Sequence, residues 1–150
     1  MNGENYSLAW NGSDFAYEFY SEGPRGKIKK QVKFQPLQQL GEHVLNVALG
    51  DKDENTGHFD NFTISNNNDR VKVLSTVAKA IFEFIDLRPA CILLIEGNTM
   101  SRTRLYQMAI SSFWLNIELR LEVLGQLGND WVPFQKGVNY ERFLIFKKIK

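Results

Sequence analysis

The sequence predicts an α+β protein in which two helices pack on a mixed, mostly antiparallel sheet. Three observations indicate this class: apolar or alternating runs typical of strands, two segments with apolar residues at helical spacing, and the order of these elements. The order is βββαβαββ, so helices interrupt an otherwise largely antiparallel sheet.

Length and composition favour one domain. The chain has 150 residues, 43% of them hydrophobic, which is enough for a single core. Residues 1–14 are polar, and we expect a loose terminus there. The net charge of +1 gives no global attraction to nucleic acid or membranes.

The setting that the sequence predicts is cytoplasmic. Cys91 is the single cysteine, which excludes an intramolecular disulfide and fits a reducing compartment. The N-terminal residues lack the pattern of a signal peptide, and no apolar run approaches the roughly 20 residues that cross a bilayer.

Three strands are predicted before residue 50. Aromatic residues mark a strand over 15–20, and turn residues join it to a second strand over 27–34, as in a hairpin. Apolar residues of this second strand share one face, and Lys30 is an exception on that face. A third strand is predicted over 43–49.

The clearest helix follows a polar segment over 51–68. Apolar residues recur at helical spacing from Leu74 to Ile85, and Pro89 stops the helix. The cluster at 66–69 is predicted to cap its first turn, because short polar side chains accept from free N–H groups.

The second half alternates strands and a helix. An unbroken apolar run predicts a central strand over 90–95, with Cys91 buried in it, and a second helix is predicted over 101–116. Alternation indicates a strand over 118–124 with Leu119 on its buried face. A loop over 125–137 and a last strand over 142–149 follow.

The first candidate site lies where the second helix begins. Arg102 and Arg104 occupy its first turn, where a cation opposes the helix dipole. Unpaired N–H groups and forked guanidinium donors at this end suit a phosphate or carboxylate, and an acidic partner such as Glu96 or Glu118 is the alternative explanation. The predicted ligand-binding residues here are Asn98, Thr99, Ser101, Arg102, Thr103, Arg104 and Tyr106.

The second candidate is the polar cluster before the first helix. Three asparagines exceed what one helix cap requires, so Asn67, Asn68 and Asp69 are predicted to form a neighbouring wall of the same site. Capping alone is the alternative.

Two other clusters have simpler explanations. Basic residues along the hairpin (Arg25, Lys27, Lys29 and Lys33) suit a nucleic-acid backbone, but lysines on edge strands also prevent aggregation, and nucleic acid is not the partner we expect. The acidic loop 51–60 lacks the glycine and glutamate positions of a calcium loop, so no metal is predicted.

The element order resembles the core of the GCN5-related N-acetyltransferase (GNAT) superfamily over residues 43–149. Residues 66–71 occupy the place of that family's loop for the acetyl-CoA pyrophosphate, and Leu105-Tyr106 is similar to a Leu-Tyr pair on its next helix. The chain has no glycine between His58 and Gly97, so the resemblance implies an acetyltransferase-like fold without the glycine-rich CoA loop.

A closer resemblance, spanning nearly the whole chain, is to a family of small uncharacterised bacterial proteins of about this length. Segments 17–26, 65–77 and 97–107 are similar to its motifs. This resemblance implies no established activity.

These patterns together predict a small protein that binds an anionic or phosphorylated ligand at a strand–loop–helix site. An acyltransferase role follows from the resemblance alone, and neither a cofactor nor an oligomeric state is predicted. The alternative is a non-catalytic interaction module, such as an adaptor or a component of a bacterial defence or toxin–antitoxin system. Its interface would be the basic hairpin or exposed aromatics such as Tyr17, Tyr20 and Trp131.

Overall fold

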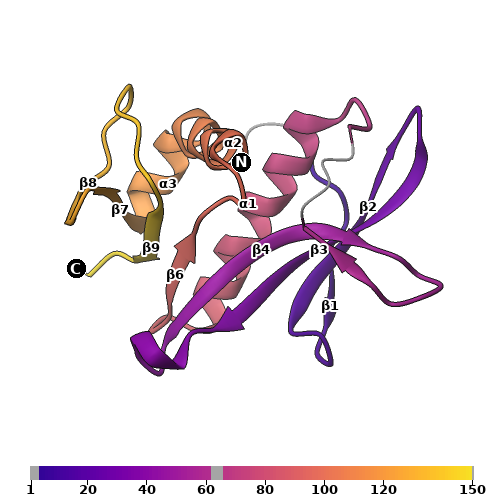
Figure 1. Ribbon diagram of the computed structural model, residues 1–150, viewed down its shortest axis with the longest axis horizontal. Coiled ribbons are helices and arrows are strands. Elements are labelled where there is room, and N and C mark those ends of the chain that lie inside the picture. Colours follow the sequence, from indigo (N-terminus) through magenta and orange to yellow (C-terminus); the bar gives the residue numbers. More distant parts are fainter. Residues whose placement is uncertain (1–3, 62–65, 150) are drawn as a thin grey trace.

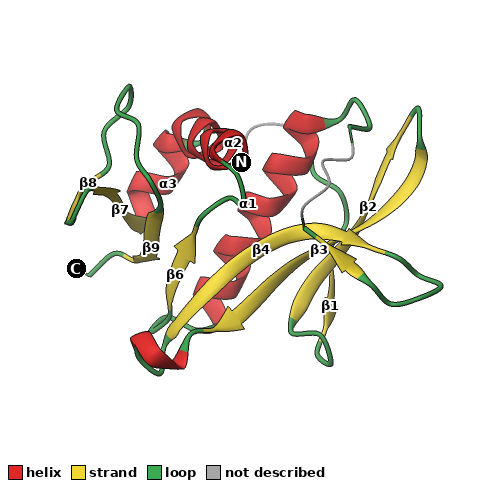
Figure 2. Ribbon diagram, in the orientation of Figure 1, coloured by secondary structure: helices red, strands yellow, loops and turns green. Residues whose placement is uncertain are grey.

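The structure, a computed structural model, describes residues 4–61 and 66–149. It is an α+β fold, as the sequence predicts, and its helices pack on one face of an open sheet (Figures 1 and 2). The helices over the described residues are α1 (Arg70–Leu87), α2 (Met100–Ser112) and α3 (Trp114–Arg120), with a short 3-10 turn at Gln38–Leu40.

The sheet is mixed and mostly antiparallel. Within the described residues its order is β1-β2-β3-β4-β6-β9-β7-β8, with β5 beside the end of β4. Among the neighbouring strands of this sheet, β4 and β6 pair in parallel and the others are antiparallel. The strands are β1 (Ala9–Asn11), β2 (Ala16–Gly23), β3 (Gly26–Pro36), β4 (Val44–Lys52), β5 (Phe59–Asp60), β6 (Ile92–Ile95), β7 (Leu121–Leu127), β8 (Asp130–Pro133) and β9 (Phe143–Lys147).

The parallel strands β4 and β6 differ in length, and β6 ends first. Val44 to Val47 of β4 pair with Ile92 to Ile95 of β6, and β6 then stops while β4 continues to Lys52. In the sequence α1 follows β4 and β5, and α2 follows β6. The N-terminal ends of these two helices lie together at the end of the sheet where β6 stops (Figure 1).

The N-terminal segment differs from the loose terminus that composition predicts. Tyr6 is buried, its backbone N–H donates to Thr76 Oγ1 at 2.9 Å, and its ring stacks on Phe19. Residues 9–11 then add strand β1 to the edge of β2. An aromatic anchor therefore orders a segment whose composition is otherwise polar.

The core lies between the sheet and α1. The predicted helical spacing is confirmed, since Val77, Ile81 and Ile85 are buried along one side of α1. Phe84 stacks on Phe34 of β3 with ring centroids 3.8 Å apart and planes 5° apart. Cys91 is buried, as predicted, and β6 is central in the sheet.

The region after α2 differs from the prediction in three ways. The predicted single helix is broken at Phe113, residues 118–120 continue as α3 rather than as a strand, and β8 occupies part of the predicted loop. Because the chain is helical there, Ile117 is buried and Leu119 is 77% exposed. The alternating pattern over 118–124 therefore predicted a strand at 118–120, where the chain is helical.

None of the helices formed by the described residues is long and apolar enough to cross a membrane.

Candidate ligand-binding cleft

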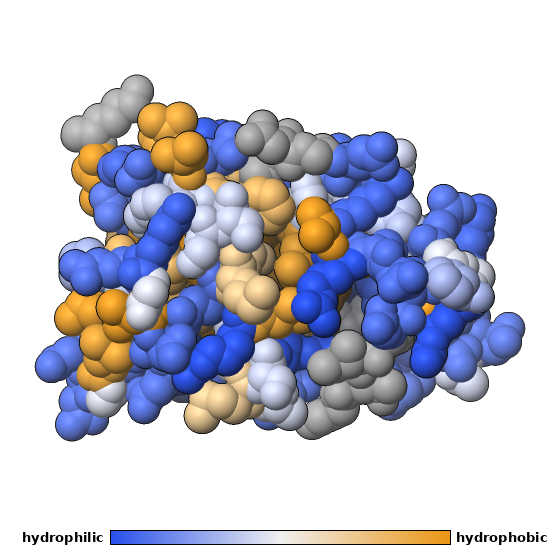
Figure 3. Space-filling view, turned by 90° about the horizontal axis from the view of Figure 1, so that it is seen from above, coloured by the Kyte–Doolittle hydropathy of each residue, from blue (hydrophilic) through white to orange (hydrophobic). Residues whose placement is uncertain are grey.

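A cleft of about 280 Å³ opens where the N-terminal turns of α1 and α2 meet the end of β4. The second half of β4 and Lys30 of β3 form its floor, and the two helices form its walls. Seen from above, the molecule shows an apolar strip between hydrophilic side chains (Figure 3). Leu74, Leu105 and Met108 contribute apolar side chains to the cleft.

Basic side chains outnumber acidic ones in this cleft. Its lining includes Lys30, Arg70, Arg102 and Arg104, and on the acidic side Asp51 and Asp69. Lys30 is buried, and its Nζ atom lies 2.6 Å from Asp51 Oδ1 across the β3–β4 pair. This pairing explains why a lysine lies on the otherwise apolar face of β3.

The side chain of Asp69 does not cap α1, although Asp69 is the N-cap residue. Its carboxylate accepts from Tyr6 Oη at 2.6 Å and from Ser21 Oγ at 2.5 Å. Burial and the hydrogen bond to Asp69 raise the pKa of Tyr6. The first turn of α1 carries no acidic residue and begins with Arg70, whose charge adds to the positive end of the helix dipole, whereas the Asp69 carboxylate beside it opposes that charge.

Asn67 holds the hairpin against this loop. The side-chain Oδ1 accepts from the backbone N–H of Arg25 at 2.7 Å, and Nδ2 donates to Ser21 Oγ and to the carbonyl oxygen of Gly26. Asn67 is 1% exposed, so this amide is structural, although it borders the cleft. Asn68 is exposed and adopts a positive φ of 62°, which Asn tolerates better than most residues.

The start of α2 is capped by its own side chains. Thr99 Oγ1 accepts from the backbone N–H of Arg102 at 3.1 Å, and Thr103 Oγ1 accepts from that of Gly97 at 3.0 Å. A Cβ atom on Gly97 would lie 2.4 Å from the Thr103 nitrogen, so only glycine fits this close approach. Thr99 and Thr103 therefore build the helix end.

Arg102 fills the space between β4 and α2. It is 9% exposed, and its Nη1 donates to the carbonyl oxygens of Leu49 at 3.1 Å and Asn61 at 2.7 Å. Asn98 Nδ2 also donates to the Asn61 carbonyl. Arg102 thereby connects β4, the segment after β5 and α2.

The Arg104 side chain contacts a different part of the fold from Arg102. Its Nη1 donates to the carbonyl oxygen of Tyr140 at 3.2 Å, and within residues 4–61 and 66–149 it forms no salt bridge with Glu96 or Glu118. Tyr106 is half-buried, lines the cleft, and has a pKa raised by burial, which the nearby Arg102 partly offsets.

The fold brings six of the ten predicted site residues together in one cleft: Asn67, Asp69, Ser101, Arg102, Arg104 and Tyr106. Asn98, Thr99, Thr103 and Asn68 do not line it. The prediction missed Lys30, Asp51 and Arg70. Two features of the sequence could have indicated Lys30 and Arg70. Lys30 lies on the apolar face of its strand, and Arg70 lies in the first turn of a helix.

Other candidate surfaces are partly neutralised or covered. Lys29 lies 3.4 Å from Glu18, and Lys27 lies 3.8 Å from Glu22, so acids of β2 accompany the hairpin lysines. The prediction that Tyr17 is an exposed aromatic residue is wrong, because only 5% of it is exposed. Among the described residues, no three His, Cys, Asp or Glu side chains converge as metal ligands.

Fold and site thus define an α+β protein with a basic cleft between two helix N-termini. The chain belongs to a family of unknown function, DUF6934, whose model matches residues 2–148. Neither a curated protein nor a solved structure matches it.

Proposed function

We propose that this protein binds a small ligand with a phosphate or another anionic group in the cleft between α1 and α2. The observation that carries the proposal is the start of α1. Its N-cap carboxylate is engaged by Tyr6 and Ser21, and Arg70 follows in the first turn beside the cleft. Backbone N–H groups at such an end attract anions.

The other basic residues of the cleft divide into two groups. Lys30 is paired with Asp51, so this ion pair adds no net charge to the cleft, and the Arg102 guanidinium is held in place by backbone carbonyls. Arg70 is exposed, and Arg104 is half-buried with its Nη1 atom donating to the Tyr140 carbonyl oxygen. We assign direct contact with the ligand to the Arg70 guanidinium and to the other N–H groups of Arg104.

The experiment is a thermal-shift and calorimetric screen against nucleotides, coenzyme A, sugar phosphates and inorganic phosphate. We expect at least one of these to stabilise the wild type. Arg70→Ala or Arg104→Ala then lowers affinity by about 1–3 kcal/mol, the scale of a charge-assisted hydrogen bond. Lys136→Ala, an exposed lysine remote from the cleft lining, is the matched control. Failure of every compound to stabilise the wild type rejects the proposal.

Acyl transfer is the second candidate function. The order β4-α1-β6-α2-α3-β7 and the separation of β4 from β6 support an acetyltransferase-like topology, and Tyr106 lies in the cleft. Two features oppose standard coenzyme binding: the loop before α1 has Asn68 in place of glycines, and Arg102 donates to the Leu49 carbonyl where β4 is free of β6. Release of free thiol from acetyl-CoA in the presence of amines, abolished in Tyr106→Phe, would favour this candidate.

The remaining alternative is a protein partner. Met100, Met108, Leu115 and Leu119 are exposed along α2 and α3, and exposed apolar side chains anchor interfaces. A stable complex in pull-down and light scattering, with no shift from any small molecule, would favour an interaction module over the ligand-binding proposal.

A further inference from the structure

We infer that the ligand carries a short aliphatic chain next to its anionic group, and that this chain enters an apolar cavity beneath the cleft. The inference rests on the proposed function, because the anionic group is what places the ligand at the start of α1. It adds the chemical class of the remainder of the ligand.

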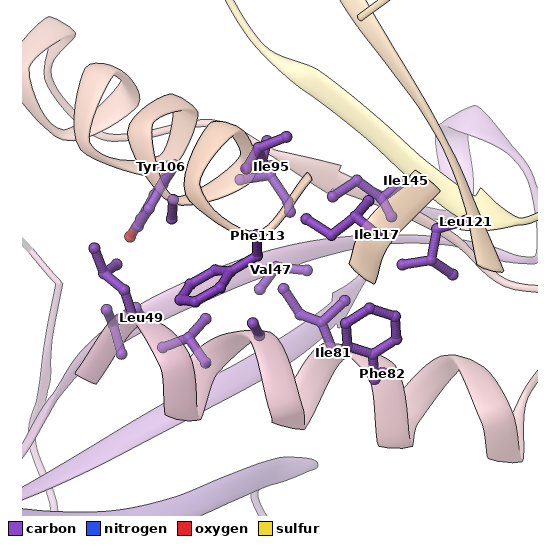
Figure 4. A pocket seen from close by; sticks show the side chains of 15 residues that line it. Val47, Leu49, Ile81, Phe82, Ile95, Tyr106, Phe113, Ile117, Leu121 and Ile145 are labelled. Carbon is purple, nitrogen blue, oxygen red and sulfur yellow. The ribbon is translucent and has the colours of Figure 1, made fainter. Parts of the chain in front are cut away.

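The cavity lies between the three helices and the sheet (Figure 4). It measures about 60 Å³ and is lined by apolar side chains, with the ring of Tyr106 at one side. Val47 of β4, Ile81 of α1, Phe113 at the α2–α3 break and Ile145 of β9 point toward it (Figure 4). A space of this kind gives water few polar partners, so it favours apolar groups.

The cavity and the cleft adjoin. Leu49, Leu74 and Tyr106 line both of them, so these three side chains form the boundary between the two spaces. On the cleft side of this boundary lie Arg70 and Arg104. A ligand bound at the start of α1 therefore has its charged end among basic groups and an apolar space directly below.

The volume of the cavity limits the size of the apolar group that it can hold. About 60 Å³ corresponds to the volume of roughly two water molecules in the liquid, which accommodates a chain of about two or three carbon atoms. An aromatic ring exceeds this space. Because no charged side chain lines the cavity, the anionic group stays outside it.

The test is calorimetric titration with inorganic phosphate and with methyl, ethyl, propyl, butyl and hexyl phosphate at one ionic strength. We expect affinity to rise about fourfold with each carbon up to propyl or butyl phosphate, and then to level off. Ala109→Leu fills the cavity from α2 and should remove this dependence while leaving the affinity for inorganic phosphate unchanged. Ala90→Leu, the same substitution at an exposed position, is the control.

The outcomes separate the two proposals. Equal affinity for all alkyl phosphates and inorganic phosphate overturns the inference and leaves the anion site standing. The inference is also overturned if Ala109→Leu, shown to be folded by circular dichroism, keeps the full dependence on chain length. Ala78→Leu, which fills the cavity from α1, replaces it if Ala109→Leu does not fold. No binding of any probe to the wild type rejects the anion site, and the inference with it.

Discussion

Lys30 and Asp51 form a partly buried ion pair across neighbouring strands, in the floor of the cleft. Their Nζ and Oδ1 atoms are 2.6 Å apart, and the lysine side chain is 8% exposed. The pair is in register on β3 and β4, so it connects the hairpin to the strand that forms the cleft floor. Its position makes it part of the cleft floor, where the two charges offset each other.

Removing one partner of this pair should destabilise the protein much more than replacing both partners. We expect Asp51→Asn to lower the free energy of unfolding by about 3–5 kcal/mol, because it leaves a buried lysine without its carboxylate. The double variant Lys30→Met/Asp51→Leu should recover most of this loss. Urea denaturation of the wild type and the two variants measures both effects, and a double variant no more stable than Asp51→Asn would contradict the prediction.

Arg102 and Arg70 should separate stability from binding. Arg102→Ala removes hydrogen bonds to Leu49 and Asn61, so we expect a loss of about 1.5–3 kcal/mol in unfolding free energy. Arg70→Ala changes an exposed side chain and should alter stability by less than about 0.5 kcal/mol. Thermal and urea denaturation test this contrast, and equal losses in the two variants would refute it.

Gly23 should not tolerate a side chain. A Cβ atom there would lie 1.9 Å from the Asn67 carbonyl oxygen, so the hairpin would have to move away from the loop before α1. We expect Gly23→Ala to cost about 3 kcal/mol, at the upper end of overpacking effects. Gly12→Ala is the control, because its Cβ atom would meet Trp10 at an ordinary 3.7 Å. Similar melting temperatures for the two variants would count against this packing.

Asp14 should make stability depend on pH in the acid range. Hydrogen bonds from Lys52 and Gln31 hold the pKa of this carboxyl below its usual value. A lowered pKa in the folded state stabilises the protein above the unfolded-state pKa of about 3.9, and this stabilisation is lost as the pH falls through the folded pKa. Asp14→Asn should therefore flatten the stability profile between about pH 5 and pH 2.

The control for this profile is Asp130→Asn, which changes an exposed carboxylate at the start of β8. We expect the wild-type profile to be retained in Asp130→Asn. Parallel profiles for wild type and Asp14→Asn, measured by urea denaturation at each pH, would show that the pair with Lys52 contributes nothing.

Much of the fold could be predicted because its signals are local. Periods of two and 3.6 residues located the hairpin and α1, an unbroken apolar run located β6, and Pro89 marked where α1 ends. The weak point was the segment 118–120, where Leu119 fits an alternating pattern as well as a helix. Packing of Ile117 against the core decides between them, and that contact is not local.

The sequence by itself determined the class of fold, the order of most of its elements, and the concentration of positive charge at the start of the second helix. Only the tertiary structure decided which partners those charged side chains have. Arg102 is taken up by the Leu49 carbonyl, and Asp69 is drawn from α1 to Tyr6, a residue 63 positions away. A sequence pattern specifies where a side chain begins, whereas its partner depends on segments that folding brings together from distant parts of the chain.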